Sequence, residues 1–140
     1  MAEATVNKSF QFELVAPEQV LASEEATMVV IPGEAGDFGV LAEHAPLLSS
    51  IRPGVVTVTS QTGETKKIFV AGGFADVSAS LCSVLAEEAV NVADLDKTAL
   101  EESVKNLQDD LGFAGDDTVK KNRILRDISI AKAKLEAIAA

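Results

Sequence analysis

The side chains that most often carry out catalysis or bind metals are scarce in this sequence. Its 140 residues include one histidine, His44, and one cysteine, Cys82. A zinc site needs three or four ligands, and no second His or Cys is present to join either residue. His44 lies in the segment 42–46, and no nucleophile elbow or other catalytic pattern surrounds it. We therefore predict no metal site and no catalytic residue, and we interpret His44 as an exposed loop residue.

Cys82 lies in an apolar segment, and no Lys, Arg or His stands beside it in the sequence to lower the pKa of its thiol. We therefore expect a small residue of the hydrophobic core. Because it is the single cysteine of the chain, it cannot form an internal disulfide.

The glycine-rich stretch 33–39 superficially resembles a phosphate-binding loop. Such a loop opens into a helix, so that backbone N–H groups face the phosphate, and it usually carries a Lys. Here Glu34 and Asp37 lie within the stretch, where their charge would repel phosphate. We expect these glycines to form tight turns, and we expect Gly72–Gly73, between two predicted strands, to mark a bulge or bend.

Composition bounds the class of protein. The formal net charge is −10 and the sequence pI is about 4.5, which argues against nucleic acid or an anionic lipid surface as a partner. No apolar run approaches the roughly 18 residues that span a membrane. The first residues resemble neither a signal peptide nor a transit peptide, so the expected location is a bacterial cytoplasm.

The first two thirds of the chain have the pattern of short β-strands. Phe10, Phe12 and Leu14 alternate with polar residues, which is the period of a half-buried strand. Residues 55–59 and 65–70 are rich in β-branched side chains and flank a turn, and residues 74–77 and 81–86 resemble another strand pair. The sequence therefore predicts a β-sandwich or barrel over residues 1–92.

The period changes near Asp94, where apolar residues begin to recur at helical spacing. One stripe comprises Leu100, Val104, Leu107 and Leu111; a second comprises Ile124, Ile128, Ala131, Leu135 and Ile138. Asp94 or Asp96 can cap the first helix, Gly112 ends it, and Asp116 or Asp117 can cap the second. The sequence predicts an antiparallel two-helix hairpin over residues 93–140.

Charge is divided between the two predicted helices. Residues 94–117 hold eight acidic and two basic residues, whereas residues 118–140 hold two acidic and six basic ones. One interpretation is pairing within the hairpin together with a solvated face. The other is a helix whose basic residues select a partner. These basic residues are Lys120, Lys121, Arg123, Arg126, Lys132 and Lys134.

Several segments, in their order and spacing, closely resemble the epsilon subunit of F-type ATP synthases across nearly all of the chain. The most specific segment runs from Ile31 through Phe38-Gly39-Val40 to His44-Ala45-Pro46-Leu47-Leu48. The others are Ile51-Arg52-Pro53-Gly54, Phe69-Val70-Ala71-Gly72-Gly73-Phe74 and Val84-Leu85-Ala86.

The resemblance implies a β-sandwich of about ten strands followed by two helices. It implies a non-catalytic central-stalk subunit that binds gamma and the c ring and couples proton transport to ATP synthesis. It places the chain peripherally at the cytoplasmic face of the bacterial inner membrane. It also implies that the c ring contacts the loops holding Glu34, Asp37, Phe38 and His44.

The resemblance further implies that the two helices can extend toward the alpha and beta catalytic subunits and inhibit ATP hydrolysis, with the six basic residues of the second helix meeting acidic loops. Some members of the family bind ATP through an arginine near the start of the first helix. Ala99 stands at that position in the run Leu95-Asp96-Lys97-Thr98-Ala99, so we expect no ATP or other cofactor. Two alternatives are a free-standing interaction module and, more remotely, a small hydrolase with an unrecognised site.

Overall fold

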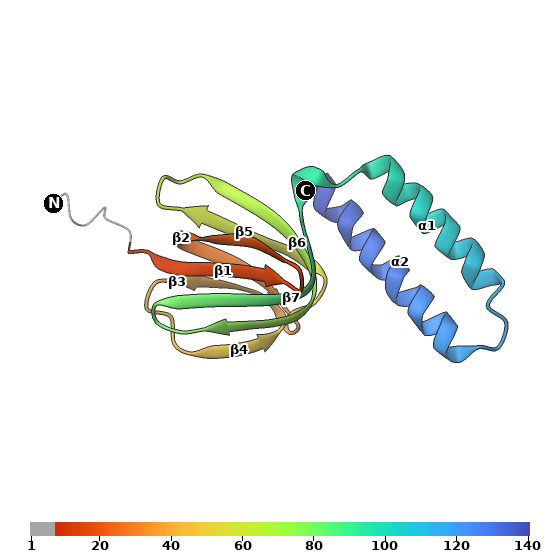
Figure 1. The fold of residues 1–140 in the computed structure, drawn as a ribbon, viewed down its shortest axis with the longest axis horizontal. Helices are drawn as coiled ribbons and strands as arrows, with labels where there is room; N and C mark the ends of the chain where they lie inside the picture. The colour runs from red at the N-terminus through yellow and green to blue at the C-terminus, as the bar shows by residue number, and fades with distance from the viewer. Residues whose placement is uncertain (1–7) are drawn as a thin grey trace. The chain divides into compact units, whose positions relative to one another are not determined.

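A computed structural model describes residues 8–140, and the chain divides into two units, Met1–Asn91 and Val92–Ala140. The first unit is built from strands and the second from helices (Figure 1). The predicted boundary between residues 92 and 93 lies one residue from this division. No helix in the described part of the chain is long and apolar enough to span a membrane.

The β-domain contains seven strands among the described residues. They are β1 (Phe10–Ala16), β2 (Gln19–Gly33), β3 (Gly36–Leu41), β4 (Leu47–Ser50), β5 (Gly54–Ser60), β6 (Thr65–Val77) and β7 (Leu81–Asn91). Their hydrogen-bonded order is β1-β7-β6-β5-β2-β3, and β4 pairs with β6. Because β1 also pairs with β2, the path closes on itself around one core. The predicted β-sandwich is confirmed.

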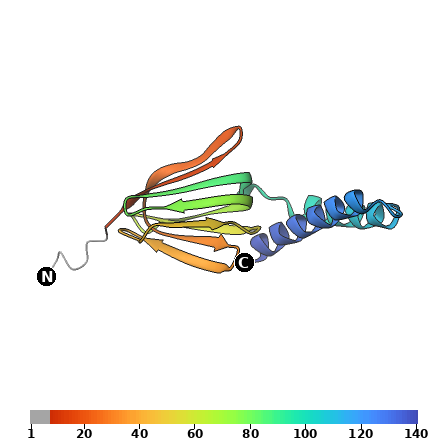
Figure 2. The ribbon, with the colours of Figure 1, turned by 90° about the horizontal axis from the view of Figure 1, so that it is seen from below.

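The count of about ten strands that the resemblance implies is compatible with these seven, because two long strands each serve as two. β2 spans 15 residues and pairs first with β1 and then with β5 and β3. Figure 2 shows its two halves on opposite sides of the domain. β6 spans 13 residues and includes both segments that the sequence suggested as separate strands, 65–70 and 74–77.

The core of the β-domain follows the predicted alternation. Phe10, Phe12 and Leu14 are buried, while Gln11 and Glu13 are only partly so. Cys82 is also fully buried in this core, as predicted. Fully burying one large apolar side chain contributes about 1.5–3 kcal/mol, so these residues hold the closed sheet together.

β6 bends at Gly72–Gly73, within one strand rather than between two. Ile68 and Val70 face the core before the bend, and Ala75 and Val77 face it afterwards. The side of the strand that faces inward has therefore changed, although the pairing register with β7 has not. Consecutive positive φ angles of 73° and 109° at the two glycines account for this inversion.

The helical unit contains α1 (Lys97–Gly112) and α2 (Thr118–Ala139), preceded by the short 3-10 turn η2 (Val92–Asp94). The carboxylate of Asp96 accepts a hydrogen bond from the Ala99 N–H at 3.2 Å, and that of Asp117 accepts one from the Lys120 N–H at 3.0 Å. Both caps are among those predicted, and α1 ends at Gly112 as predicted.

The two helices pack through a small apolar cluster. Ile124 and Ile128 of α2 are buried with Ala114 of the connection, and Leu107 and Leu111 of α1 pack against them. All five except Ala114 belong to the predicted stripes. The cluster is far smaller than the core of the β-domain, so we expect the hairpin to contribute less to stability.

The bend supplies the first testable prediction. A Cβ on Gly73 would lie 1.9 Å from the carbonyl oxygen of Leu85, and the φ of 109° is unfavourable for any L side chain. We expect Gly73→Ala to lower the free energy of unfolding by about 3 kcal/mol or more, as measured by urea denaturation.

The matched control is Gly112→Ala at the end of α1. A Cβ there meets nothing within 4 Å, and the φ angle is not positive. This substitution should change stability by no more than about 1 kcal/mol. Equal costs for the two variants would show that the bend does not depend on glycine.

Candidate docking surface

The structure separates the residues predicted to contact the c ring into two places. Glu34, Asp37 and Phe38 lie in or beside the turn between β2 and β3, whereas His44 follows the other end of β3. Each strand residue advances about 3.4 Å, so the ends of β3 lie on the order of 15 Å apart. These residues therefore lie at opposite ends of β3.

The β2–β3 turn is held by a residue that sequence reasoning did not single out as functional. Arg52 donates from Nη1 to the Gly33 carbonyl at 2.7 Å and from Nη2 to the Asp37 carboxylate at 2.5 Å. The backbone N–H of Glu34 also donates to the Ser50 carbonyl at 2.9 Å. The turn is thus tied to the segment that links β4 and β5.

His44 is partly buried rather than fully exposed. Its Nδ1 lies 2.6 Å from the Ala45 carbonyl oxygen, which suits a tautomer that donates from this nitrogen. The preceding residue, Glu43, adopts a φ of 66°. Its carboxylate forms an ion pair with Lys8, with Nζ and Oε1 3.1 Å apart. Across residues 8–140, no group of three His, Cys, Asp or Glu side chains is placed to hold a metal.

Cys82 has no features of a nucleophile. Burial, together with the smaller effect of the nearby charge of Asp76, raises the pKa of its thiol to about 12. A thiol with so high a pKa forms almost no reactive thiolate near neutral pH.

A row of side chains crosses the outer face of four strands. Val15 of β1 pairs with Leu85 of β7, Leu85 pairs with Phe74 of β6, and Phe74 pairs with Ser50 of β4. Phe74 and Leu85 are 54% and 52% exposed, and Leu48 of β4, on the same face, is 71% exposed. We call Val15, Leu48, Phe74 and Leu85 the apolar face. Large apolar side chains exposed together commonly mark an interaction surface.

An open hollow of about 590 Å³ lies along the apolar face. Its walls come from Val15–Pro17 at the end of β1, from Ser50–Ile51 at the end of β4, from Gly73–Phe74 of β6 and from Leu85–Glu87 of β7. Gly73 connects the hollow to the β4–β5 link, because its carbonyl accepts a hydrogen bond from the Ile51 N–H at 3.0 Å. The hollow and the Arg52-bound turn thus meet at residues 50–52.

Sequence reasoning missed the apolar face because Phe74 and Leu85 lie in apolar strand segments that looked like core. The one available signal was the Gly72–Gly73 pair. At this pair the strand exchanges its inward and outward sides. Beyond it, Phe74 points outward, whereas Ala75 and Val77 point into the core.

The basic residues of α2 lie around its buried stripe. Lys121 and Lys134 are partly buried, and the other four are exposed. Within the described residues, no carboxylate lies within ion-pairing distance of Lys120, Lys121, Arg123 or Lys132. For Lys120, Arg123 and Lys132 the structure therefore favours an exposed cationic face over pairing within the hairpin, and Lys121, which also has no such partner within residues 8–140, is partly buried.

The sequence was compared with those of known proteins. The family described as ATP synthase, Delta/Epsilon chain, beta-sandwich domain matches residues 9–92. An ATP synthase epsilon chain of Rhizobium meliloti (strain 1021) is 48% identical over 117 residues, which is 84% of this chain and 86% of that one. The epsilon chain of Rhodospirillum rubrum is 43% identical over 140 residues, covering 100% of this chain and 97% of the relative.

Solved structures show the same fold. A chain in the mitochondrial ATP synthase of Euglena gracilis, solved as an OSCP/F1/c-ring assembly, aligns with a TM-score of 0.81 at 21% identity, over 94% of this chain and 82% of that one. A chain in the central stalk and c-ring of the Tetrahymena thermophila enzyme aligns with a TM-score of 0.61 at 14% identity, over 96% and 99%. The extent and identity of the sequence matches show that this chain belongs to the ATP synthase epsilon-chain family.

Proposed function

We propose that this chain is a non-catalytic central-stalk subunit of an F-type ATP synthase, which links gamma to the c ring and so couples proton transport to ATP synthesis. Membership in the epsilon-chain family supports this role. The apolar face is the observation that carries it, because a well-packed domain that exposes Phe74, Leu85 and Leu48 together is suited to docking. Through this complex the chain would be peripheral to the cytoplasmic face of the bacterial inner membrane.

Two surfaces of different chemistry suit two partners. The apolar face and its hollow fit gamma, since a lasting protein interface has an apolar centre. The β2–β3 turn exposes Glu34 and Asp37, with the partly buried Phe38 beside them, and this polar surface fits the polar loops of the c ring. His44, at the opposite end of β3, would make a second contact with the c ring. The shared segment 50–52 supports a subunit that bridges both partners.

The apolar face predicts which side chains gamma requires. The double substitution Phe74→Ser with Leu85→Ser removes two half-exposed apolar side chains. In the unsubstituted chain, docking would bury the exposed half of each. Each contributes about 1 kcal/mol, so we expect the dissociation constant for gamma to rise by tenfold or more. The dissociation constant can be measured by titrating the chain over gamma that is immobilised on a surface.

The control is Leu41→Ser, which removes an apolar side chain that is 58% exposed at the end of β3. Leu41 pairs with Met28 in the second half of β2 and is not part of the apolar face. The dissociation constant of this variant should stay within about twofold of the unsubstituted chain. Equal loss in both variants would mean that general surface hydrophobicity, and not this face, drives docking.

The hairpin has the charge and size expected of a regulatory arm. We infer that α2 can leave α1 and reach the alpha and beta catalytic subunits, where its basic residues would meet acidic loops. Such a change requires two packings within a few kcal/mol of each other, and the small apolar cluster between the helices is compatible with this.

Lys121→Ala with Arg123→Ala should relieve inhibition of ATP hydrolysis in the assembled enzyme. Each lost charge pair contributes about 0.2–1 kcal/mol, so the loss of two should raise hydrolysis about two- to thirtyfold at low salt and less at physiological salt. Lys97→Ala with Lys105→Ala on α1 removes the same charge and serves as the control. If hydrolysis against ionic strength is the same for both variants and the unsubstituted enzyme, α2 does not inhibit through charge.

We propose that the chain binds no ATP. Ala99 offers no guanidinium for phosphate, and its backbone N–H already donates to the Asp96 cap. Isothermal calorimetry should detect no saturable binding below millimolar ATP, whereas Ala99→Arg should strengthen any residual affinity. Micromolar affinity of the unsubstituted chain would refute this proposal.

A further inference from the structure

Arg52 contacts both arms of a single exposed turn. Its Nη1 donates to the carbonyl of Gly33 on β2, and its Nη2 donates to the carboxylate of Asp37 on β3. Across this hairpin, Gly33 pairs with Gly36 and Pro32 pairs with Asp37. One guanidinium therefore fixes the two arms relative to each other, as the planar fork of arginine allows and a lysine ammonium does not.

The backbone around Arg52 strengthens the same connection. The Arg52 N–H donates to the Pro32 carbonyl at 3.0 Å, the Glu34 N–H donates to the Ser50 carbonyl at 2.9 Å, and Gly33 forms a bridge with Ile51. The tip itself has little packing of its own. Glu34, Ala35 and Gly36 are exposed, so the order of the turn depends on these few bonds.

The two acidic residues of the turn differ in whether a cation neutralises their charge. Arg52 compensates Asp37 directly, at 2.5 Å. Glu34 is exposed, and its carboxylate has no side-chain partner within residues 8–140. The turn therefore presents one uncompensated negative charge, and that charge lies on Glu34.

We propose that Arg52 is a positioning residue for the β2–β3 turn, and that Glu34 rather than Asp37 is the acid this turn offers to a basic protein loop. The first part concerns the chain alone. The second rests on the proposed function, in which this turn docks onto the c ring.

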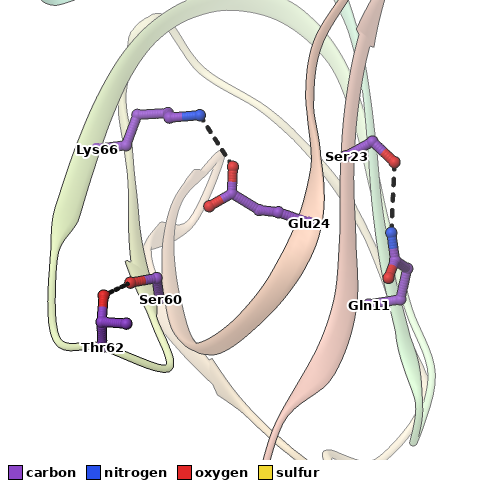
Figure 3. A network of polar contacts seen from close by, with 6 residues as sticks. All are labelled: Gln11, Ser23, Glu24, Ser60, Thr62 and Lys66. Carbon is purple, nitrogen blue, oxygen red and sulfur yellow. Dashed lines mark hydrogen bonds and ion pairs between the residues drawn. The ribbon is translucent and has the colours of Figure 1, made fainter.

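An ordinary exposed ion pair is the competing explanation, since the two side chains are 42% and 61% exposed. Such pairs contribute about 0.2–1 kcal/mol and order little. Lys66 and Glu24 form a matched pair elsewhere in the domain, at 2.9 Å with side chains 45% and 30% exposed (Figure 3). This pair connects β6 with β2 and contacts no residue of the turn.

Hydrogen exchange in the free chain tests the positioning role. The probe is the Glu34 N–H, whose bond to Ser50 reports whether the turn is attached. We expect Arg52→Ala to speed its exchange about three- to tenfold, Arg52→Lys to have a smaller effect, and Lys66→Ala to have none. Unchanged exchange in Arg52→Ala, or equal changes in Arg52→Ala and Arg52→Lys, would overturn the positioning role.

Docking of the full chain onto a reconstituted gamma and c-ring subcomplex tests the second part. Glu34→Gln and Asp37→Asn each remove one negative charge from the same turn, and the asparagine still offers an acceptor to Arg52. A difference between them therefore reports contact rather than net charge. We expect Glu34→Gln to raise the dissociation constant about three- to fivefold and Asp37→Asn less than twofold.

A larger effect of Asp37→Asn, or equal effects, would overturn the assignment of Glu34. Failure of the unsubstituted chain to bind the subcomplex would instead contradict the proposed function. In that event the exchange of the Glu34 N–H in the free chain would still decide the role of Arg52.

Discussion

The inversion of β6 at Gly72–Gly73 is the constraint on which the rest of the β-domain depends. Two consecutive residues with positive φ let the strand exchange its inward and outward sides without losing register against β7. The core continues on either side of the bend, and Phe74 is turned outward. The Gly73 carbonyl also holds Ile51, so the same bend sets the wall of the hollow and the start of the Arg52 segment.

The two candidate surfaces are connected to this bend through the short segment 50–52. Ser50 and Ile51 line the hollow, and Arg52, next in the chain, holds the β2–β3 turn. An apolar surface and a charged turn thus share one rigid link. The helical unit has its own small core and its own helix caps.

Local signals in the sequence predicted most of the secondary structure. The alternation at Phe10, Phe12 and Leu14 and the caps at Asp96 and Asp117 involve neighbours in the chain, so a pattern of a few residues suffices. The glycine pair was expected to mark a bulge or bend between two strands, whereas it forms a bend inside the single strand β6. Arg52 and the apolar face could not be predicted, because both depend on pairings between residues far apart in sequence.

Oxidative footprinting of the chain, free and in the assembled stalk, tests the central claim most directly. Phe74, Leu85 and Leu48 are exposed on the apolar face, whereas Leu41 and its partner Met28 are exposed elsewhere, at 58% and 40%. Mass spectrometry measures the oxidation of each side chain. We expect strong protection of the first three on assembly and little change at Leu41 and Met28. Protection of Leu41 and Met28, with Phe74 and Leu85 still oxidised, would contradict the claim that the apolar face docks.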